Sequence, residues 1–175
     1  DLRLLASGRL EVRWRPREGL RWSDGRPLTS DDVRFALEVS PDPRVVGVGT
    51  PAPRDVTPTY DGAVGTALEC VQPLPRHALE AIRRDGGYEA VTEARRARPL
   101  PTTGPYRVVS FTADREAVLE ANPSFAGPPP SIRRVELRCI ADHAALVAAF
   151  ERGELDLIAP SALSVEEADA LGQRR

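Results

Sequence analysis

The sequence is poor in the residues that build metal centres and nucleic-acid surfaces. Only two cysteines and two histidines occur in 175 residues, and the cysteines form no CxxC pair, so a zinc site of ordinary spacing is not expected. All 24 basic residues are arginines, but they are scattered and the net charge is -2, which argues against nucleic acid as a partner. No apolar run approaches about 18 residues, so no transmembrane segment is expected.

Methionine is absent, and the first residues show neither a charged region nor an apolar leader. We therefore expect the chain to be a segment of a longer protein, with any targeting signal outside it. The two cysteines, Cys70 and Cys139, lie far apart between apolar neighbours. That setting favours two buried free thiols, with a disulfide as the alternative if the protein is exported.

Motifs for catalysis or cofactor binding are also missing. We find no nucleophile elbow, phosphate loop or dinucleotide glycine pattern. His77 and His143 each stand at an expected helix start, which is more typical of capping or surface residues than of a base. Asp24, Asp31 and Asp32 lack the spacing of a calcium loop. The residues alone thus indicate an α+β domain without catalytic residues, metal or cofactor.

Turn and capping residues organise the first forty positions. Alternation of Leu10, Val12 and Trp14 with charged residues predicts a half-buried strand. Asp24-Gly25 predicts a tight turn, and we expect Trp22 before it to be buried. A helix is expected from about Ser30, after a sequence close to a capping box, and Ser40-Pro41 ends it.

The middle of the chain is expected to alternate between short strands and helices. Valines at 45–48 and residues 56–60 predict two strands that pair, whereas 63–71 could be strand or helix. A helix is expected after Pro75, ended by Gly86-Gly87. Residues 89–98 are polar and predict a weakly helical surface segment.

The last seventy residues predict a hairpin followed by a β-α-β unit. Residues 106–111 and 117–121 alternate around a turn-length gap, and 132–140 is expected to join their sheet. Asp142 is the expected cap of a helix that runs to Glu151, with Gly153 just beyond its end. Leu155, Leu157 and Ile158 predict a following strand, and Ser164 the start of a last helix.

One stretch, WSDGRPLTSDDVRFALE, resembles the family 5 extracytoplasmic solute-binding proteins of ABC importers, which bind dipeptides, oligopeptides or nickel. Three further blocks resemble that family in the same order: LPRH at 74–77, TGPY at 103–106 with LEANP at 119–123, and GELD at 153–156. The matching residues, which we interpret as scaffold rather than ligand contacts, are Trp22, Asp24, Gly25, Pro27, Thr29, Asp32, Thr103, Gly104, Pro105, Tyr106, Asn122, Pro123, Gly153 and Asp156.

The resemblance implies an α+β fold with mixed sheets and short flanking helices, as in a lobe of a periplasmic-binding-protein type II-like fold. We expect residues 1–100 to form a smaller subdomain and 101–175 to belong to the main lobe. The family usually has a long segment after the first helix, which FALEVSPDPRVVGV shortens here. The ligand-contacting residues cannot be located from the motifs.

The resemblance also implies a function for the whole protein. It would be the receptor of an importer, capturing a peptide or related small solute by hinged closure of two lobes. It would be a monomer outside the cytoplasm, in the periplasm or as a cell-surface lipoprotein, and its partner would be the membrane permease. The alternative is a cytoplasmic ligand-sensing domain of a transcriptional regulator with the same fold.

Overall fold

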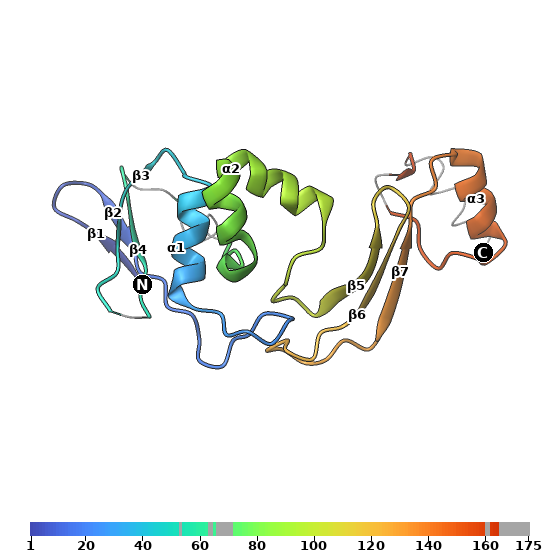
Figure 1. The fold of residues 1–175 in the computed structure, drawn as a ribbon, viewed down its shortest axis with the longest axis horizontal. Coiled ribbons are helices and arrows are strands. Elements are labelled where there is room, and N and C mark those ends of the chain that lie inside the picture. The colour runs from blue at the N-terminus through green and yellow to red at the C-terminus, as the bar shows by residue number, and fades with distance from the viewer. Residues whose placement is uncertain (53, 63–64, 66–71, 160–161, 165–175) are drawn as a thin grey trace.

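A computed structural model describes residues 1–52, 54–62, 65, 72–159 and 162–164. Within these residues there are seven strands, which form two separate antiparallel sheets, and three helices (Figure 1). This confirms the expected α+β class. The elements are β1 (Leu2–Leu4), β2 (Leu10–Val12), α1 (Ser30–Val39), β3 (Val45–Gly49), β4 (Thr57–Tyr60), α2 (Arg76–Ala97), β5 (Tyr106–Thr112), β6 (Glu116–Ala121), β7 (Arg134–Arg138) and α3 (His143–Glu151).

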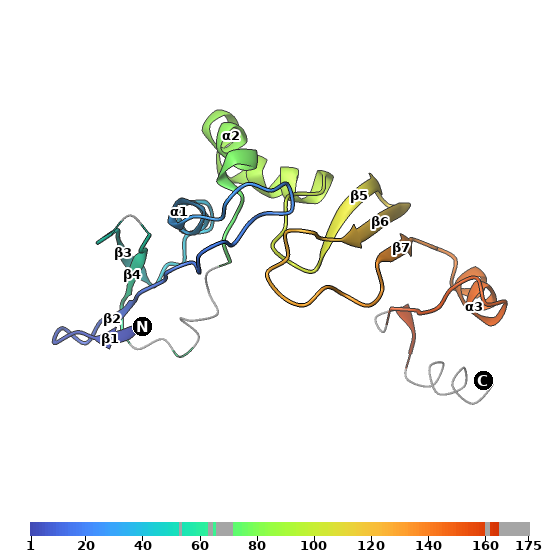
Figure 2. The ribbon, with the colours of Figure 1, turned by 90° about the horizontal axis from the view of Figure 1, so that it is seen from below.

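The first sheet has the order β1-β2-β4-β3, and α1 lies between it and α2 (Figure 2). On the sheet side, Val33 and Leu37 of α1 pack with Val56, which bridges to Trp14. On the other side, Phe35 faces the buried residues of α2. Apolar residues on two sides of α1 are what a helix between two layers needs. The expected strands at 10–14, 45–48 and 56–60 and the helix from Ser30 are therefore confirmed.

A kink at Gly87 divides α2 into two helical parts, so the expected helix end at Gly86-Gly87 is confirmed. Gly87 has φ 70° and ψ −157°, and helix continues beyond it to Ala97. Val91 in this second part is fully buried against the α1 layer. That burial explains why the polar residues 89–98 are helical, because packing outweighs weak local propensity.

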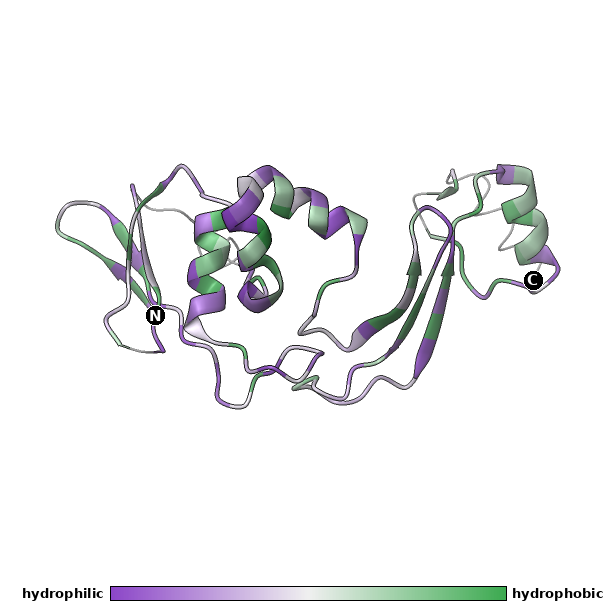
Figure 3. Cartoon of the chain, viewed as in Figure 1, coloured by the Kyte–Doolittle hydropathy of each residue, from purple (hydrophilic) through white to green (hydrophobic). Residues whose placement is uncertain are grey.

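The second sheet confirms the expected hairpin and its third strand. β5 pairs with β6 from Tyr106–Ala121 to Thr112–Glu116, and β6 pairs with β7. Hydrophobic and hydrophilic residues alternate along these strands, as Figure 3 shows. This sheet lies to one side of the α1–α2 layers, and α3 lies beyond it (Figure 1). The proposed division near residue 100 is compatible with this arrangement and stays a prediction.

The expected β-α-β unit is not formed in the described part of the chain. Asp142 caps α3 by accepting a hydrogen bond from the Ala145 amide, as expected, but no strand follows the helix. An extended segment forms a strand only where a neighbouring strand supplies backbone hydrogen bonds. Leu157, in the segment expected to be that strand, is 81% exposed. Cys139 is a free and exposed thiol, which corrects the expectation that it is buried.

The expectations for residues 63–71, including Cys70, and for a last helix after Ser164 lie outside the described residues. No helix among the described ones is both long and apolar enough to cross a membrane.

The bend in α2 yields a first prediction. The dihedral angles of Gly87 lie in a region that is essentially restricted to glycine, so Gly87→Ala should reduce the free energy of unfolding by about 1–3 kcal/mol. Gly47→Ala is the matched control, since its added Cβ meets nothing within 4 Å and its φ is not positive. Chemical denaturation measures both, and equal stability of the two variants would contradict the bend.

Candidate functional site

A buried carboxylate, that of Asp32, joins three segments of the chain. Its Oδ2 accepts from the Trp22 indole Nε1 at 3.2 Å and from the Thr29 amide at 2.9 Å. Its Oδ1 accepts from the Arg76 amide at 3.0 Å, at the start of α2. Thr29 and Asp32 together form the capping box of α1. Asp32 is 4% exposed and Trp22 3%, which confirms the expected burial of the tryptophan.

A second contact between the same segments lies beside the first. His77 Nε2 is 2.7 Å from Asp24 Oδ2, and the imidazole meets the Trp22 ring edge-on at 6.4 Å. Burial pushes the pKa of the Asp24 carboxyl upward, but hydrogen bonds from the Arg26 amide and from His77 outweigh it. The Asp24 pKa therefore lies below its usual value. The motif at 22–32 and the motif at 74–77 are thus in direct contact.

The TGPY and LEANP motifs meet in a similar way. Asn122 is buried, donates to the Gly104 carbonyl at 2.8 Å from Nδ2, and donates from its amide to the Pro105 carbonyl. The Ser23 amide donates to the Thr102 carbonyl at 2.8 Å, and the Thr102 amide donates to the Ser23 hydroxyl at 3.1 Å. These two hydrogen bonds join this group to the turn at 24–25. Hydrogen bonds thereby connect the first and third motifs.

The remaining motif residues are placed more simply. Tyr106 donates from its hydroxyl to the Ile132 carbonyl at 2.8 Å, which ties β5 to the chain before β7. Thr103 is half-buried at the entry to β5, and Pro123 is exposed after Asn122.

Two of the three motif glycines have positive φ. Gly25, at φ 85°, makes the predicted turn, and Pro27 bridges to Arg21 across it. Gly153, at φ 75°, lies just past the end of α3, as expected. Asp156 is exposed. Of the fourteen motif residues, those at 22–32 and 103–122 gather at the contacts described, whereas Gly153 and Asp156 lie apart on the far side of the second sheet.

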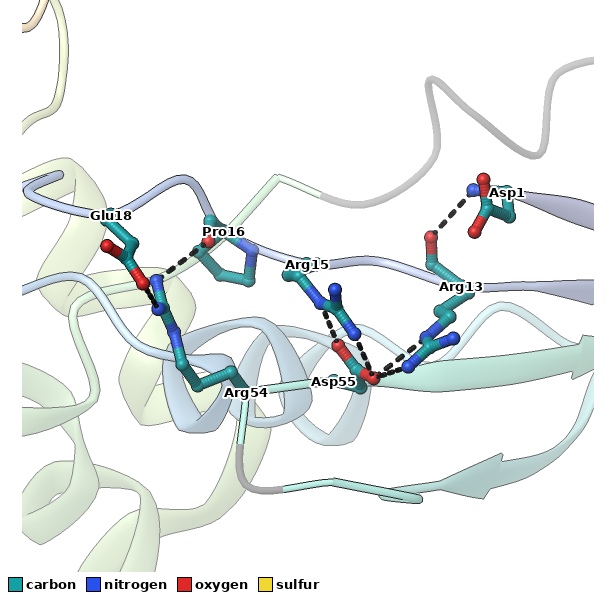
Figure 4. Close-up of polar contacts among 7 residues, drawn as sticks. All are labelled: Asp1, Arg13, Arg15, Pro16, Glu18, Arg54 and Asp55. Carbon is teal, nitrogen blue, oxygen red and sulfur yellow. Dashed lines mark hydrogen bonds and ion pairs between the residues drawn. The ribbon is translucent and has the colours of Figure 1, made fainter.

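A charged cluster that the motifs did not indicate lies at the end of the first sheet. Asp55 is fully buried and is held by two arginines from the segment that follows β2 (Figure 4). Arg15 donates to it from Nε at 2.6 Å and from Nη2 at 3.0 Å, and Arg13 donates from Nε at 2.8 Å and also from Nη2. Hydrogen bonds from Arg15 and then Arg13 hold the pKa of the Asp55 carboxyl well below its usual range.

An open hollow of about 470 Å³ adjoins this cluster, and a second of about 420 Å³ shares Pro16, Arg17, Glu18 and Arg54 with it. They lie beside residues 15–21, which we call the strap. Arg54 secures the strap by donating to the Glu18 carboxylate and, at 3.3 Å, to the Pro16 carbonyl. Figure 4 shows both sets of contacts along the same stretch of chain. Among the described residues, no group of three His, Cys, Asp or Glu side chains could hold a metal ion.

Comparison with known proteins agrees with this arrangement. The profile of the bacterial extracellular solute-binding proteins, family 5 (Middle), matches residues 7–173. The chain belongs to this family.

Named relatives and a solved structure extend the comparison. A putative ABC transporter peptide-binding protein of Brucella ovis is 28% identical over 149 residues, covering 77% of this chain and 28% of the relative. A probable D,D-dipeptide-binding periplasmic protein of Escherichia coli is 25% identical over 172 residues, covering 90% and 32%. An ABC transporter substrate-binding protein from Sinorhizobium meliloti superposes with a TM-score of 0.74 at 20% identity, covering 99% of this chain and 37% of that one.

These coverages show that the chain spans only about a third of the length of each of the three family proteins. The structural likeness establishes the periplasmic-binding-protein type II-like fold that the motifs implied.

The Asp55 cluster yields a prediction about pH. Its carboxyl pKa is lower in the folded chain than the usual aspartate value of about 3.9, so ionised Asp55 stabilises the fold above that pH. Asp55→Asn should lower the melting temperature at pH 7, and the deficit should shrink as pH falls below about 4, where protonation removes the wild-type advantage.

Asp85→Asn is the control, because its carboxylate is exposed and pairs only with the adjacent Arg84 among the described residues. If the loss of melting temperature in Asp55→Asn is the same at every pH, the prediction is wrong, because the ionised carboxylate of Asp55 would then not be what stabilises the contact with the two arginines.

Proposed function

We propose that the protein containing this chain is the solute-binding receptor of an ABC-type importer, and that the chain supplies part of one lobe. The observation that carries the proposal is the family match over residues 7–173. The names of the Brucella ovis and Escherichia coli relatives support a peptide or a related small solute as the ligand. They also favour the receptor over the ligand-sensing regulatory domain.

The contacts around Asp32 support a mechanical role for the motif residues. A hinged receptor needs lobes that move as rigid units, so that closure brings preformed surfaces onto the ligand. Asp32 and Asn122 are buried and make hydrogen bonds within the lobe, which supports a scaffold role. The ligand would be released unchanged, because binding and transport need no catalytic step.

The proposed partner is the membrane permease of the importer, and the proposed location is outside the cytoplasm, in the periplasm or on the cell surface. A monomer meets the mechanical requirement, since both walls of a hinged cleft come from one chain. No role in nucleic-acid binding is proposed for this segment, in keeping with its net charge of -2.

The test uses the full-length product of the gene. Its melting temperature is measured with a panel of di- and oligopeptides, nickel chelates and oligosaccharides, and each hit is titrated by calorimetry. A true ligand at a hundred times its Kd should add about 2.7 kcal/mol to the free energy of unfolding.

We expect at least one peptide or chelate to bind with one-to-one stoichiometry and to be recovered chemically unchanged. Conversion of the ligand would contradict a receptor function, and a folded full-length protein that binds no member of the panel would remove the support for peptide transport.

A further inference from the structure

We propose that the two hollows beside the strap form a binding site for the carboxylate or phosphate group of a small anion. The site borders the motif residues Pro27 and Thr29, and the proposal does not depend on the importer function.

The two hollows are joined by a common set of walls. Both hollows are lined by Pro16, Arg17, Glu18 and Arg54. The strap is therefore a wall that the two hollows share, and together we treat them as one depression. Each part, at about 420 and 470 Å³, is within the size range of small-molecule sites. The described residues that line the depression include no aromatic side chain, so they offer little for stacking and would recognise a ligand by charge and hydrogen bonds.

The charge of the lining is positive. Four guanidinium groups face two carboxylates, those of Glu18 and Asp55, which leaves an excess of two positive charges. This is a local feature, because the whole chain has a net charge of -2. An arginine excess in a concave surface attracts anions, and the planar guanidinium matches the oxygens of carboxylate and phosphate.

The arginines are held in advance of binding. Asp55 engages Arg15 through Nε and Nη2, and within the described residues nothing accepts from its Nη1. The Arg15 side chain is 59% exposed although its carboxylate partner is fully buried. Asp55 also engages Arg13, so one carboxylate fixes two guanidinium groups and leaves one positive charge uncompensated. Fixing a side chain beforehand lowers the entropy cost of binding.

Arg17 is the group most available to a ligand. It is exposed, lines both hollows, and has no hydrogen bond or ion pair within the part of the chain that the structure describes. Arg54, by contrast, is tied to Glu18 and to the Pro16 carbonyl and serves to hold the wall. Arg17 can therefore move onto an anion without breaking any contact that the structure shows.

The test titrates the full-length protein by calorimetry with two probes, inorganic phosphate and succinate, at low and at physiological salt. We expect saturable binding of at least one probe, weakened by salt because the contacts are ionic. Arg17→Gln should weaken that binding about tenfold or more while leaving the melting temperature unchanged. Preference for phosphate identifies a phosphorylated solute as the source of the anion, and preference for succinate a carboxylate solute.

Arg96→Gln is the matched control, since Arg96 is exposed in the last turn of α2 and lines neither hollow. Binding of neither probe, or equal binding by the wild type and Arg17→Gln, would overturn the proposal. A peptide that binds the full-length protein should bind Arg17→Gln equally well, so failure here is distinguishable from failure of the importer function.

Discussion

The buried carboxylate of Asp32 is the interaction on which the first half of the structure depends. A charge that is 4% exposed is costly unless hydrogen bonds replace its water, and here donors come from the tryptophan before the turn, from the cap of α1 and from the start of α2. If any one donor is removed, the remaining hydrogen bonds offset less of the free-energy cost of burying the carboxylate. The contact between α1 and α2 is therefore fixed at one point as well as by apolar packing.

This arrangement separates the residues that identify the family from those that would recognise a ligand. Trp22, Asp32 and Asn122 are directed at other parts of the same lobe, and they build a rigid body whatever the solute.

Much of the fold could be predicted because the local signals agreed. The Asp24-Gly25 turn, the cap at Thr29 and the alternation in β5 and β6 each depend on neighbours in sequence. Two other outcomes depend on contacts between segments that are distant in sequence. Residues 89–98 are helical because Val91 is buried against another layer, and Leu155 to Ile158 form no strand because no described strand pairs with them.

The candidate site was less predictable than the fold. The alternation of Arg13 and Arg15 showed only that both lie on the polar face of a strand. Nothing near Asp55 in sequence reveals that its carboxylate is buried between them, because the partners are 40 and 42 residues apart. The spacing of the motifs likewise gave their order along the chain but not the contact between Asp24 and His77.

The central claim is that Trp22 and Asp32 act as one unit in stabilising the lobe. A double-mutant cycle with Trp22→Phe and Asp32→Asn, measured by chemical denaturation of the full-length protein, tests it most directly. The account predicts that the double variant loses less stability than the sum of the single variants, with a coupling energy of about 1 kcal/mol or more. Additivity within about 0.5 kcal/mol would contradict it, since the two side chains would then contribute independently.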